Sequence, residues 1–221
     1  MLPDGRGGPH VFVDDLDDPT FDPDDRHHLV RVLRVRPGDP LTVSDGAGRW
    51  RPCVLGDEPE PTGAIVEVPA PAVEITIGFP PVKGDRPDWA VQKLTELGVD
   101  RIVVLETEHG VVRWTGERLQ RQLSRWRRIA REAAMQSRRV RLPQLDGPRA
   151  VGDLAGSPGV AMADRSGGTP SLDHPTILVG PEGGWSAAER ALDGPRVCVG
   201  THVLRVETAA LAAAVHLAGQ R

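Results

Sequence analysis

The sequence predicts an α/β protein in two parts, a small N-terminal β-barrel followed by an α/β domain built on a parallel sheet. Short strand-like segments separated by turn dipeptides fill residues 10–69, a pattern typical of a small barrel. After the linker-like Pro69-Ala70-Pro71, strands alternate with helices, which favours a parallel sheet covered by helices. At 221 residues the chain is long enough for two modest domains. We therefore expect domains at residues 1–70 and 73–221.

The first part is expected to contain four strands and one helix. Turn signals at Pro37-Gly38, Asp45-Gly46 and Gly56-Asp57 separate the apolar runs. A helix is predicted over His27–Arg34, because the apolar periodicity there ends just before Pro37-Gly38. The predicted strands are His10–Val13, Leu41–Ser44, Trp50–Leu55 and Ala64–Val68.

The second part is expected to contain five strands and three helices. The first helix shows the expected asymmetry, with Pro87 at its start and Gly98 just past its end. The predicted strands are Val73–Phe79, Arg101–Leu105, Val160–Ala163, Ile177–Gly180 and Val197–Gly200, and the predicted helices are Pro87–Leu97, Glu117–Arg139 and Glu207–Ala218.

The composition excludes several classes of protein. Hydrophobic content of 39% with 26% charged residues is that of an ordinary globular protein. No apolar run reaches the roughly 18 residues of a membrane span and the N-terminus lacks the features of a signal peptide, so we expect a cytoplasmic protein. Cys53 and Cys198 lie far apart, and His27 and His28 have no ligand at metal-binding spacing, so neither a disulfide framework nor a metal site is expected.

Charge is segregated along the chain although its net value is only −4. Residues 1–25 hold eight Asp against one Arg, whereas residues 113–141 hold ten Arg against two Glu. On a helical projection Arg118, Arg121, Arg125, Arg128, Glu132, Gln136 and Arg139 form one stripe opposite an apolar face. The stripe is either a phosphate-binding surface or a solvated helix face. Only two lysines occur, Lys83 and Lys93. Their presence in an arginine-rich chain reflects either chance or a requirement for a compact ammonium group.

Three glycine-bearing strand ends are the most informative chemical signal. Ile177–Val179 runs into Gly180-Pro181-Glu182-Gly183-Gly184, Val197–Val199 into Gly200, and Leu204–Ala209 follows. Ligands of open α/β sheets bind at the carboxyl ends of strands, where glycine permits a close approach to the backbone. The loops match neither a Walker loop nor GxGxxG, and a glycine turn alone is more often structural.

Five motifs in order give a specific resemblance that extends from about His27 to Ala213. They are HHLVRVLRVRPGD, KGDRPDWAVQKLTELGVDRIV, REAAMQSRR followed by Pro143, ILVGPEGGWSAAE and VLRVETAALA. Together they resemble the RsmE-type 16S ribosomal RNA uracil-N3 methyltransferase family of the SPOUT class. One departure is Glu108-His109-Gly110, which stands where the family commonly has an Arg-Ser pair.

The resemblance implies a PUA-like N-terminal barrel, a trefoil-knotted SPOUT domain that binds S-adenosylmethionine, and a homodimer. The expected cofactor-binding residues are Leu178, Val179, Gly180, Glu182, Gly183, Val199, Gly200, Val203, Leu204, Arg205 and Thr208. The expected RNA-binding residues are Arg31, Arg34, Lys83, Lys93, Arg121, Arg125, Arg128, Glu132, Gln136 and Arg139. The small residues Ala209, Ala210, Ala212, Ala213 and Ala214 of the last helix permit either dimer packing or burial within their own domain.

The predicted reaction is methyl transfer from S-adenosylmethionine to N3 of a uridine in 16S ribosomal RNA or the small ribosomal subunit. The uracil N3 proton must leave, which requires a base or stabilisation of the developing anion. Glu182, Arg205 and Glu207 are the catalytic candidates, although Glu207 would equally favour the start of the last helix through its dipole. Two alternatives stay open, a non-catalytic RNA-binding ribosome-assembly factor and a ribose 2′-O-methyltransferase of the same fold.

Overall fold

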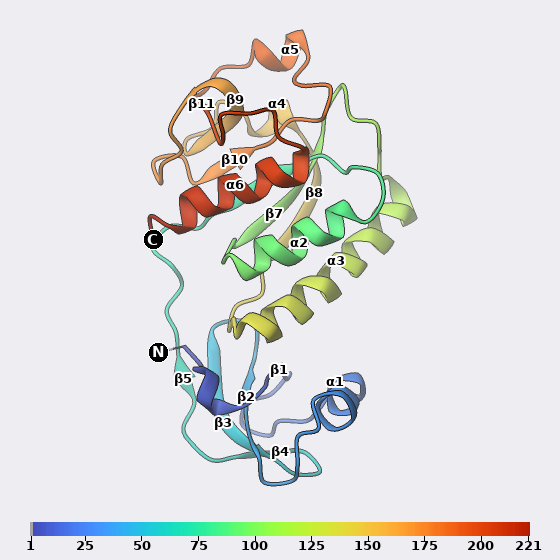
Figure 1. Cartoon of the computed structure of the whole chain (residues 1–221), viewed down its shortest axis with the longest axis vertical. Helices are drawn as coiled ribbons and strands as arrows, with labels where there is room; N and C mark the ends of the chain where they lie inside the picture. Colours follow the sequence, from blue (N-terminus) through green and yellow to red (C-terminus); the bar gives the residue numbers. More distant parts are fainter. Residues whose placement is uncertain (1) are drawn as a thin grey trace. The chain divides into compact units, whose positions relative to one another are not determined.

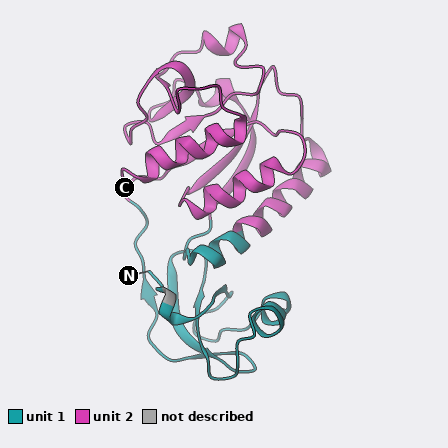
Figure 2. Cartoon of the chain, viewed as in Figure 1, with its two compact units in different colours: residues 1–71, 131–142 teal, residues 72–130, 143–221 magenta. Residues whose placement is uncertain are grey.

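Residues 2–221 are described by a computed structural model, in which the chain forms two compact units (Figure 2). Unit 1 consists of the N-terminal residues up to Pro71 together with Arg131–Leu142, and unit 2 consists of Ala72–Ala130 and Pro143–Arg221. The boundary after Pro71 coincides with the predicted linker. The assignment of Arg131–Leu142 to unit 1 was not predicted from the sequence. The division into domains 1–70 and 73–221 stays a prediction, because packing units are not a test of independent folding.

Unit 1 is built on a five-stranded sheet with two helical segments in its N-terminal part, the short η1 and the run of α1 and η2. The sheet has the order β1-β2-β3-β4, with β5 also paired to β3, and only the β1–β2 pair is parallel (Figure 1). The elements are η1 (Gly5–Gly7), β1 (His10–Phe12), α1 (Pro23–His27), η2 (His28–Val32), β2 (Pro40–Ser44), β3 (Arg49–Leu55), β4 (Pro59–Pro61) and β5 (Val66–Glu67). Leu29, Leu41, Val43 and Cys53 are buried at its core, and the partly buried Met135 packs against them.

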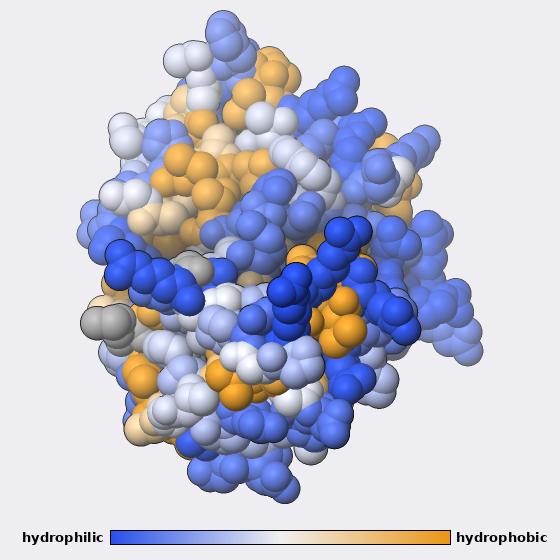
Figure 3. Space-filling view, turned by 60° about the horizontal axis from the view of Figure 1, so that its bottom comes forward, coloured by the Kyte–Doolittle hydropathy of each residue, from blue (hydrophilic) through white to orange (hydrophobic). Residues whose placement is uncertain are grey.

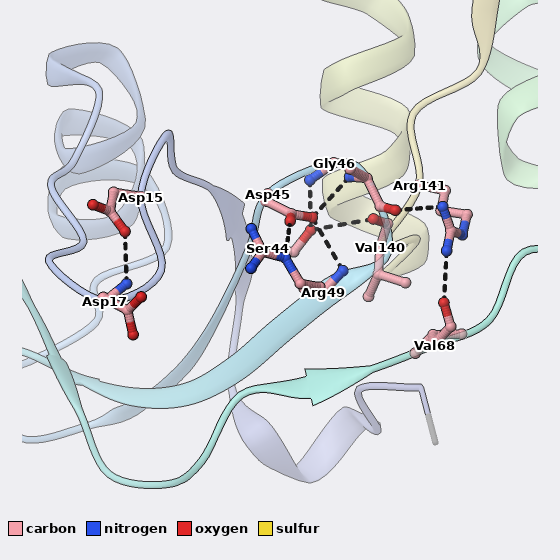
Figure 4. A network of polar contacts seen from close by, with 10 residues as sticks. Asp15, Asp17, Ser44, Asp45, Gly46, Arg49, Val68, Val140 and Arg141 are labelled. Atoms are coloured by element: carbon pink, nitrogen blue, oxygen red, sulfur yellow. Dashed lines mark hydrogen bonds and ion pairs between the residues drawn. The ribbon is translucent and has the colours of Figure 1, made fainter.

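Arg131–Leu142 is attached to unit 1 by polar contacts from several elements. The Arg131 guanidinium donates to the Asp25 carboxylate, with Nη1 2.9 Å from Oδ1, and to the Phe12 carbonyl at 3.2 Å. The Gly48 amide donates to the Val140 carbonyl at 3.0 Å. Arg141 Nη2 donates to the Val68 carbonyl at 2.7 Å (Figure 4). These contacts account for its membership of unit 1.

The turn between β2 and β3 is held by one carboxylate, as Figure 4 shows. Asp45 accepts hydrogen bonds from the Ala47 amide at 2.8 Å and from Nε of Arg49 at 2.8 Å. Partial burial raises the pKa of Asp45, but the hydrogen bonds from Ala47 and Arg49 outweigh this and hold the pKa below its usual range. The carboxylate therefore stays ionised and keeps the hairpin closed at neutral pH.

Unit 2 is a six-stranded parallel sheet with the order β11-β9-β10-β6-β7-β8 (Figure 1). Helix α2 packs against α6, and α6 packs against β6. The strands are β6 (Thr76–Phe79), β7 (Arg101–Glu106), β8 (Gln144–Ala150), β9 (Val160–Gly168), β10 (Thr176–Leu178) and β11 (Arg196–Val197). The helices are α2 (Arg86–Glu96), α3 (Gly116–Ser137), of which Arg131–Ser137 belongs to unit 1, α4 (Val151–Leu154), α5 (Ala187–Arg190) and α6 (Val206–Ala218).

The core of unit 2 combines the apolar strands with an aromatic cluster. Trp126 is fully buried, and its ring centroid lies 5.7 Å from that of Phe79 and 5.1 Å from that of Trp114. The Trp126 indole donates to Asp88 Oδ1 at 3.1 Å. This bond satisfies the one polar atom of the ring and joins α3 to the first turn of α2.

The predicted helices and apolar strands are present with shifted bounds, except that the strand predicted over Val197–Gly200 shares only Val197 with β11 (Arg196–Val197). The helix predicted over His27–Arg34 begins earlier, at Pro23, because the Asp22 side chain caps it by accepting from the Asp24 amide, and its regular part ends at Val32. The strand predicted over Ala64–Val68 is limited to Val66–Glu67. Strands β4 and β8 were missed because Pro59–Pro61 and Gln144–Ala150 lack apolar alternation. Helices α4 and α5 are too short for periodicity to reveal.

Across residues 2–221, no helix combines the length and the apolar character that crossing a membrane requires.

A buried histidine in β1 gives unit 1 a pH-dependent stability. His10 is 3% exposed, its Nδ1 lies 2.8 Å from Thr42 Oγ1, and its Nε2 has no hydrogen-bond partner among residues 2–221. Burial, with a smaller effect of the Arg138 charge, lowers the pKa of His10 from 6.5 to about 4. The ring is therefore neutral in the folded protein at neutral pH.

We expect mild acid to destabilise unit 1 through His10. Between pH 6.5 and about 4 the unfolded chain binds a proton that the folded chain does not, so stability falls as the pH drops through this window. Linkage gives a loss of about 2 kcal/mol between pH 7 and pH 5. Urea unfolding at the two pH values measures it, and His10→Asn should lose about 2 kcal/mol less. Equal losses in the parent and the variant would show that other groups carry the acid sensitivity.

Candidate functional site

Strand β9 and the segments that follow β10 and β11 in unit 2 surround a pocket of about 320 Å³. Strand β9 lies between β11 and β10, and all three strands are parallel. The chain segments that follow the paired residues of each strand therefore lie at the same edge of the sheet. The lining residues are Ala163, Asp164, Arg165, Val179, Gly180, Pro181, Glu182, Gly184, Trp185, Arg190, Cys198, Val199, Gly200, His202, Val203, Leu204, Val206 and Ala209. The volume is at the lower end of the range of small-molecule sites.

Trp185 joins two of the three segments. Its indole Nε1 donates to the Ala163 carbonyl at 2.9 Å, and the residue is 5% exposed. A Cβ placed on Gly180 would lie 3.0 Å from the Trp185 ring, closer than side chains normally pack. Glycine at position 180 therefore lets the strand end lie directly on the indole, and the two residues form one wall of the pocket.

The second glycine of the pocket is constrained by its own loop. A Cβ on Gly200 would lie 3.0 Å from Cδ1 of Leu204, and both residues line the pocket. The Cys198 thiol donates to the Gly200 carbonyl at 3.2 Å. A larger residue at position 200 would push Leu204 or enter the pocket itself.

Two carboxylates, Asp164 and Glu182, line the pocket. Hydrogen bonds from the Ser166 hydroxyl at 2.7 Å and the Ser166 amide at 2.9 Å lower the pKa of Asp164, so it is ionised at neutral pH. Glu182 is exposed and makes no hydrogen bond or ion pair within residues 2–221. Its carboxylate is therefore available to a bound molecule.

The loop that carries Glu182 is supported from the end of β7. His109 Nδ1 lies 3.0 Å from the Gly184 carbonyl, in hydrogen-bond contact. Glu189 accepts from the amides of Ser186 at 2.8 Å and Glu108 at 3.0 Å, and Ser186 and Glu189 form a capping box at the start of α5. The Glu108-His109-Gly110 segment, which departs from the family pattern, thus contacts the glycine loop.

The structure gathers most of the residues predicted to bind a cofactor. Val179, Gly180, Glu182, Val199, Gly200, Val203 and Leu204 line the pocket. Leu178, Gly183, Arg205 and Thr208 do not. Leu178 is fully buried, Gly183 packs against His109, and Arg205 and Thr208 are exposed at the start of α6.

Six polar or aromatic lining residues were not predicted from the sequence. They are Asp164, Arg165, Trp185, Arg190, Cys198 and His202. A signal for the first two was present, because Val160–Ala163 was recognised as a strand and residues that follow a strand in such a sheet belong to its ligand-binding edge.

Glu207 is turned away from the pocket. It is 7% exposed, its Oε1 lies 3.8 Å from an Arg86 nitrogen at the start of α2, and its Oε2 has no hydrogen-bond partner within residues 2–221. Its neighbours Val206 and Ala209 line the pocket instead. Of the three catalytic candidates, Glu182 alone lines the pocket.

The residues predicted to bind RNA fall in both units. In unit 1, Arg34, Glu132 and Gln136 line a hollow of about 1050 Å³, whereas Arg31 and Arg139 do not. Around Arg31, the exposed side chains of Val30, Val32 and Leu33 make the surface apolar as well as basic. Figure 3, which turns the bottom of the Figure 1 view forward, shows apolar patches bordered by strongly hydrophilic side chains.

In unit 2, several predicted RNA-binding cations already have acidic partners. Lys93 pairs with Glu96 at 2.8 Å, Arg121 with Glu117 at 3.3 Å, and Arg125 with Asp88 at 2.6 Å. Lys83 and Arg125 line a hollow of about 340 Å³, and Arg128 is exposed. Among residues 2–221, no group of three or more His, Cys, Asp or Glu side chains is arranged to hold a metal ion.

Two family models together match nearly the whole chain. A model described as an RNA methyltransferase domain matches residues 69–218. A model described as an RNA methyltransferase PUA domain matches residues 21–68.

Curated relatives match over most of their length. A ribosomal RNA small subunit methyltransferase E from Mycobacterium bovis is 32% identical over 91% of this chain and 88% of the relative. The protein of the same name from Bacillus subtilis is 29% identical over 87% of each chain.

Solved structures match the fold of the whole chain. A probable rRNA-methyltransferase from Porphyromonas gingivalis is 29% identical, with a TM-score of 0.75 over 93% of this chain and 95% of the other. A ribosomal RNA small subunit methyltransferase E from Neisseria gonorrhoeae, solved bound to S-adenosyl methionine, is 29% identical, with a TM-score of 0.73 over 94% of this chain and 95% of the other.

Proposed function

This chain belongs to the ribosomal RNA small subunit methyltransferase E family, and on this premise we propose that it transfers a methyl group from S-adenosylmethionine to small-subunit ribosomal RNA. The fold class expected from the resemblance, a SPOUT α/β domain with a PUA-like N-terminal domain, is confirmed. The observation that carries the proposal is the pocket formed by β9 and the segments after β10 and β11, whose walls are glycine backbone, apolar side chains, two carboxylates and the side chains of Arg165, Arg190 and His202.

The pocket residues fit S-adenosylmethionine. Gly180 and Gly200 bring the backbone to the pocket surface, where a Cβ on either residue would crowd Trp185 or Leu204. Val179 and Leu204 offer apolar surface for an adenine ring. The ionised Asp164 can accept from a hydroxyl or ammonium group of the cofactor. The bound cofactor supplies an electrophilic methyl group on a positively charged sulfur.

The nucleotide position that we propose is N3 of a uridine in 16S ribosomal RNA. Glu182 is the residue best placed to accept the N3 proton, because it lines the pocket and has no acidic or basic partner within residues 2–221. Glu182 would take the N3 proton on its carboxylate, while the methyl group supplied by the cofactor would exchange its bond to sulfur for a bond to N3, leaving a neutral thioether. Arg205, exposed beside Leu204, remains a candidate for stabilising negative charge on the uracil oxygens.

Glu207 has a different role in this proposal. Since its carboxylate is buried beside Arg86 and does not line the pocket, we assign it to holding the start of α6 against α2. A carboxylate in the first turn is also favoured by the helix dipole. Val206 and Ala209, which do line the pocket, are thereby kept in place.

The reaction can be tested directly by mass spectrometry of ribosomal RNA nucleosides after incubation with the protein and S-adenosylmethionine. We expect 3-methyluridine with the parent protein and none with Gly200→Val, because that side chain meets Leu204 and fills the pocket. Gly152→Val is the matched control, since a Cβ at Gly152 meets nothing within 4 Å. A 2′-O-methylated nucleoside would identify a ribose methyltransferase, and RNA binding without any methylated product would identify a non-catalytic assembly factor.

Glu182→Gln should lower turnover at saturating substrates by about 100-fold or more, the usual contribution of a general base. Cofactor and RNA affinities should change little. The rate of the variant should rise more steeply with pH than that of the parent, because ionisation of uracil in solution replaces the lost base. Arg205→Ala and Glu207→Gln are measured alongside. If all three variants keep near-parent turnover, the base lies on the RNA or on another protein chain.

We further propose that the protein acts in the cytoplasm as a homodimer. The alanines that suggested helix packing are largely used within unit 2, where Ala209, Ala210, Ala213 and Ala214 of α6 are buried. The dimer therefore rests on the family resemblance and on the exposed Val203 and Val215 near the two ends of α6. Light scattering at micromolar concentration should give about twice the monomer mass. A monomer mass would refute the dimer.

A further inference from the structure

A second polar hollow in unit 2, of about 340 Å³, shares no lining residue with the proposed cofactor pocket. Lys83 and Asp85 line it from the turn that leads into α2, and Asp88 lines it from the first turn of that helix. Arg118, Gln122 and Arg125 line it from α3, where their spacing of four and three residues places them on one helix face. The buried Trp114 forms part of its wall.

Two of the cations in this hollow have no acceptor in the protein. Lys83 and Arg118 are exposed, and neither makes a hydrogen bond or an ion pair with any residue in the range 2–221. This distinguishes them from Lys93 and Arg121, which pair with glutamates on their own helices. An external anion can therefore bind both without breaking an existing contact.

The third cation, Arg125, is held in a fixed orientation. Its Nε and Nη2 lie 2.7 and 2.6 Å from Oδ2 of Asp88, while Oδ1 of Asp88 accepts from the Trp126 indole at 3.1 Å. Trp126 is fully buried, so the carboxylate is anchored to the core. The remaining nitrogen of Arg125, Nη1, makes no hydrogen bond within residues 2–221. A guanidinium oriented in this way loses little side-chain entropy when it binds an anion.

We propose that this hollow binds one phosphodiester group of the substrate RNA through Lys83, Arg118 and the oriented Arg125. Three cations against the carboxylates of Asp85 and Asp88 leave one positive charge in excess, which matches the single negative charge of a phosphodiester. The inference rests on the proposed function, because that function supplies the RNA. A backbone contact of this kind sets the position of the RNA without reading its sequence.

The test compares three substitutions that remove the same charge. Lys83→Gln and Arg118→Gln remove cations of the hollow. Arg127→Gln is the matched control, because Arg127 lies on α3, is exposed, has no partner within residues 2–221 and does not line the hollow. The affinity of each protein for a 16S ribosomal RNA transcript is measured by fluorescence anisotropy over a range of salt concentrations, without cofactor.

We expect Lys83→Gln and Arg118→Gln each to weaken RNA binding about tenfold at low salt. Each should also flatten the plot of log affinity against log salt by about one unit. Arg127→Gln should change the affinity less than about twofold, and all three variants should bind S-adenosylmethionine like the parent. Equal losses of RNA affinity in all three variants would show a diffuse charge effect and overturn the site. Parent affinity in both Lys83→Gln and Arg118→Gln would overturn it as well.

Asp88→Asn tests the orientation of Arg125. Charge alone predicts tighter RNA binding when a carboxylate is removed, whereas loss of the anchor predicts weaker binding, and we expect the weaker binding. Tighter binding in a variant with parent thermal stability would refute the positioning role of Asp88. The Arg118→Gln comparison does not depend on this variant, so a folding defect in Asp88→Asn leaves the main test intact.

A small anion is distinguished from RNA by calorimetry with inorganic phosphate at constant ionic strength. Phosphate binding that is lost in Arg118→Gln while RNA affinity is unchanged would assign the hollow to a free anion and overturn the proposal. Because RNA binding is measured without methyl transfer, the phosphate site and the proposed methylation reaction can each be refuted independently of the other. A protein that passes this test yet yields no methylated nucleoside would refute the proposed reaction and not this site.

Discussion

The adjacent positions of β11, β9 and β10 in a parallel sheet are the constraint on which the proposed active site depends. Strand β9 pairs with β10 over Val160–Met162 and with β11 on its other side, and β10 pairs with β6. Parallel pairing brings the segments after these strands to one edge. The glycine loop after β10, the second half of β9 and the loop after β11 therefore enclose a single pocket. A shift in register of β10 would displace Gly180 from the Trp185 ring.

Much of this arrangement could be predicted from the sequence, because apolar strands that run into glycine are a local signal. The strand ending near Gly180 and the last helix, predicted from Glu207 and observed from Val206, were recognisable in this way, whereas the strand predicted over Val197–Gly200 ends at Val197. Five ordered motifs then identified the family. The directions of side chains at the start of α6 were not predictable, since one helical step of about 100° decides whether Val206 or Glu207 faces the pocket.

The pairing of charged side chains could not be predicted from the sequence either. The arginine-rich stretch of α3 was evident from composition, but composition treats every arginine alike. The structure separates Arg121 and Arg125, which have acidic partners, from Arg118, which has none within residues 2–221. The partner of Arg125, Asp88, lies 37 residues earlier in the chain, and no local pattern links the two. Pairing across elements thus decides which cations remain available to a ligand.

The two thiols of the chain differ in a way that makes one of them a chemical handle on the pocket. Cys53 is 1% exposed in the core of unit 1, and burial raises the pKa of its thiol to about 11, so very little reactive thiolate is present at neutral pH. Cys198 is partly exposed and lines the pocket beside Gly200. A thiol-directed spin label or fluorophore would therefore attach to native protein at this one wall, and a bound ligand would compete with the label for the same space.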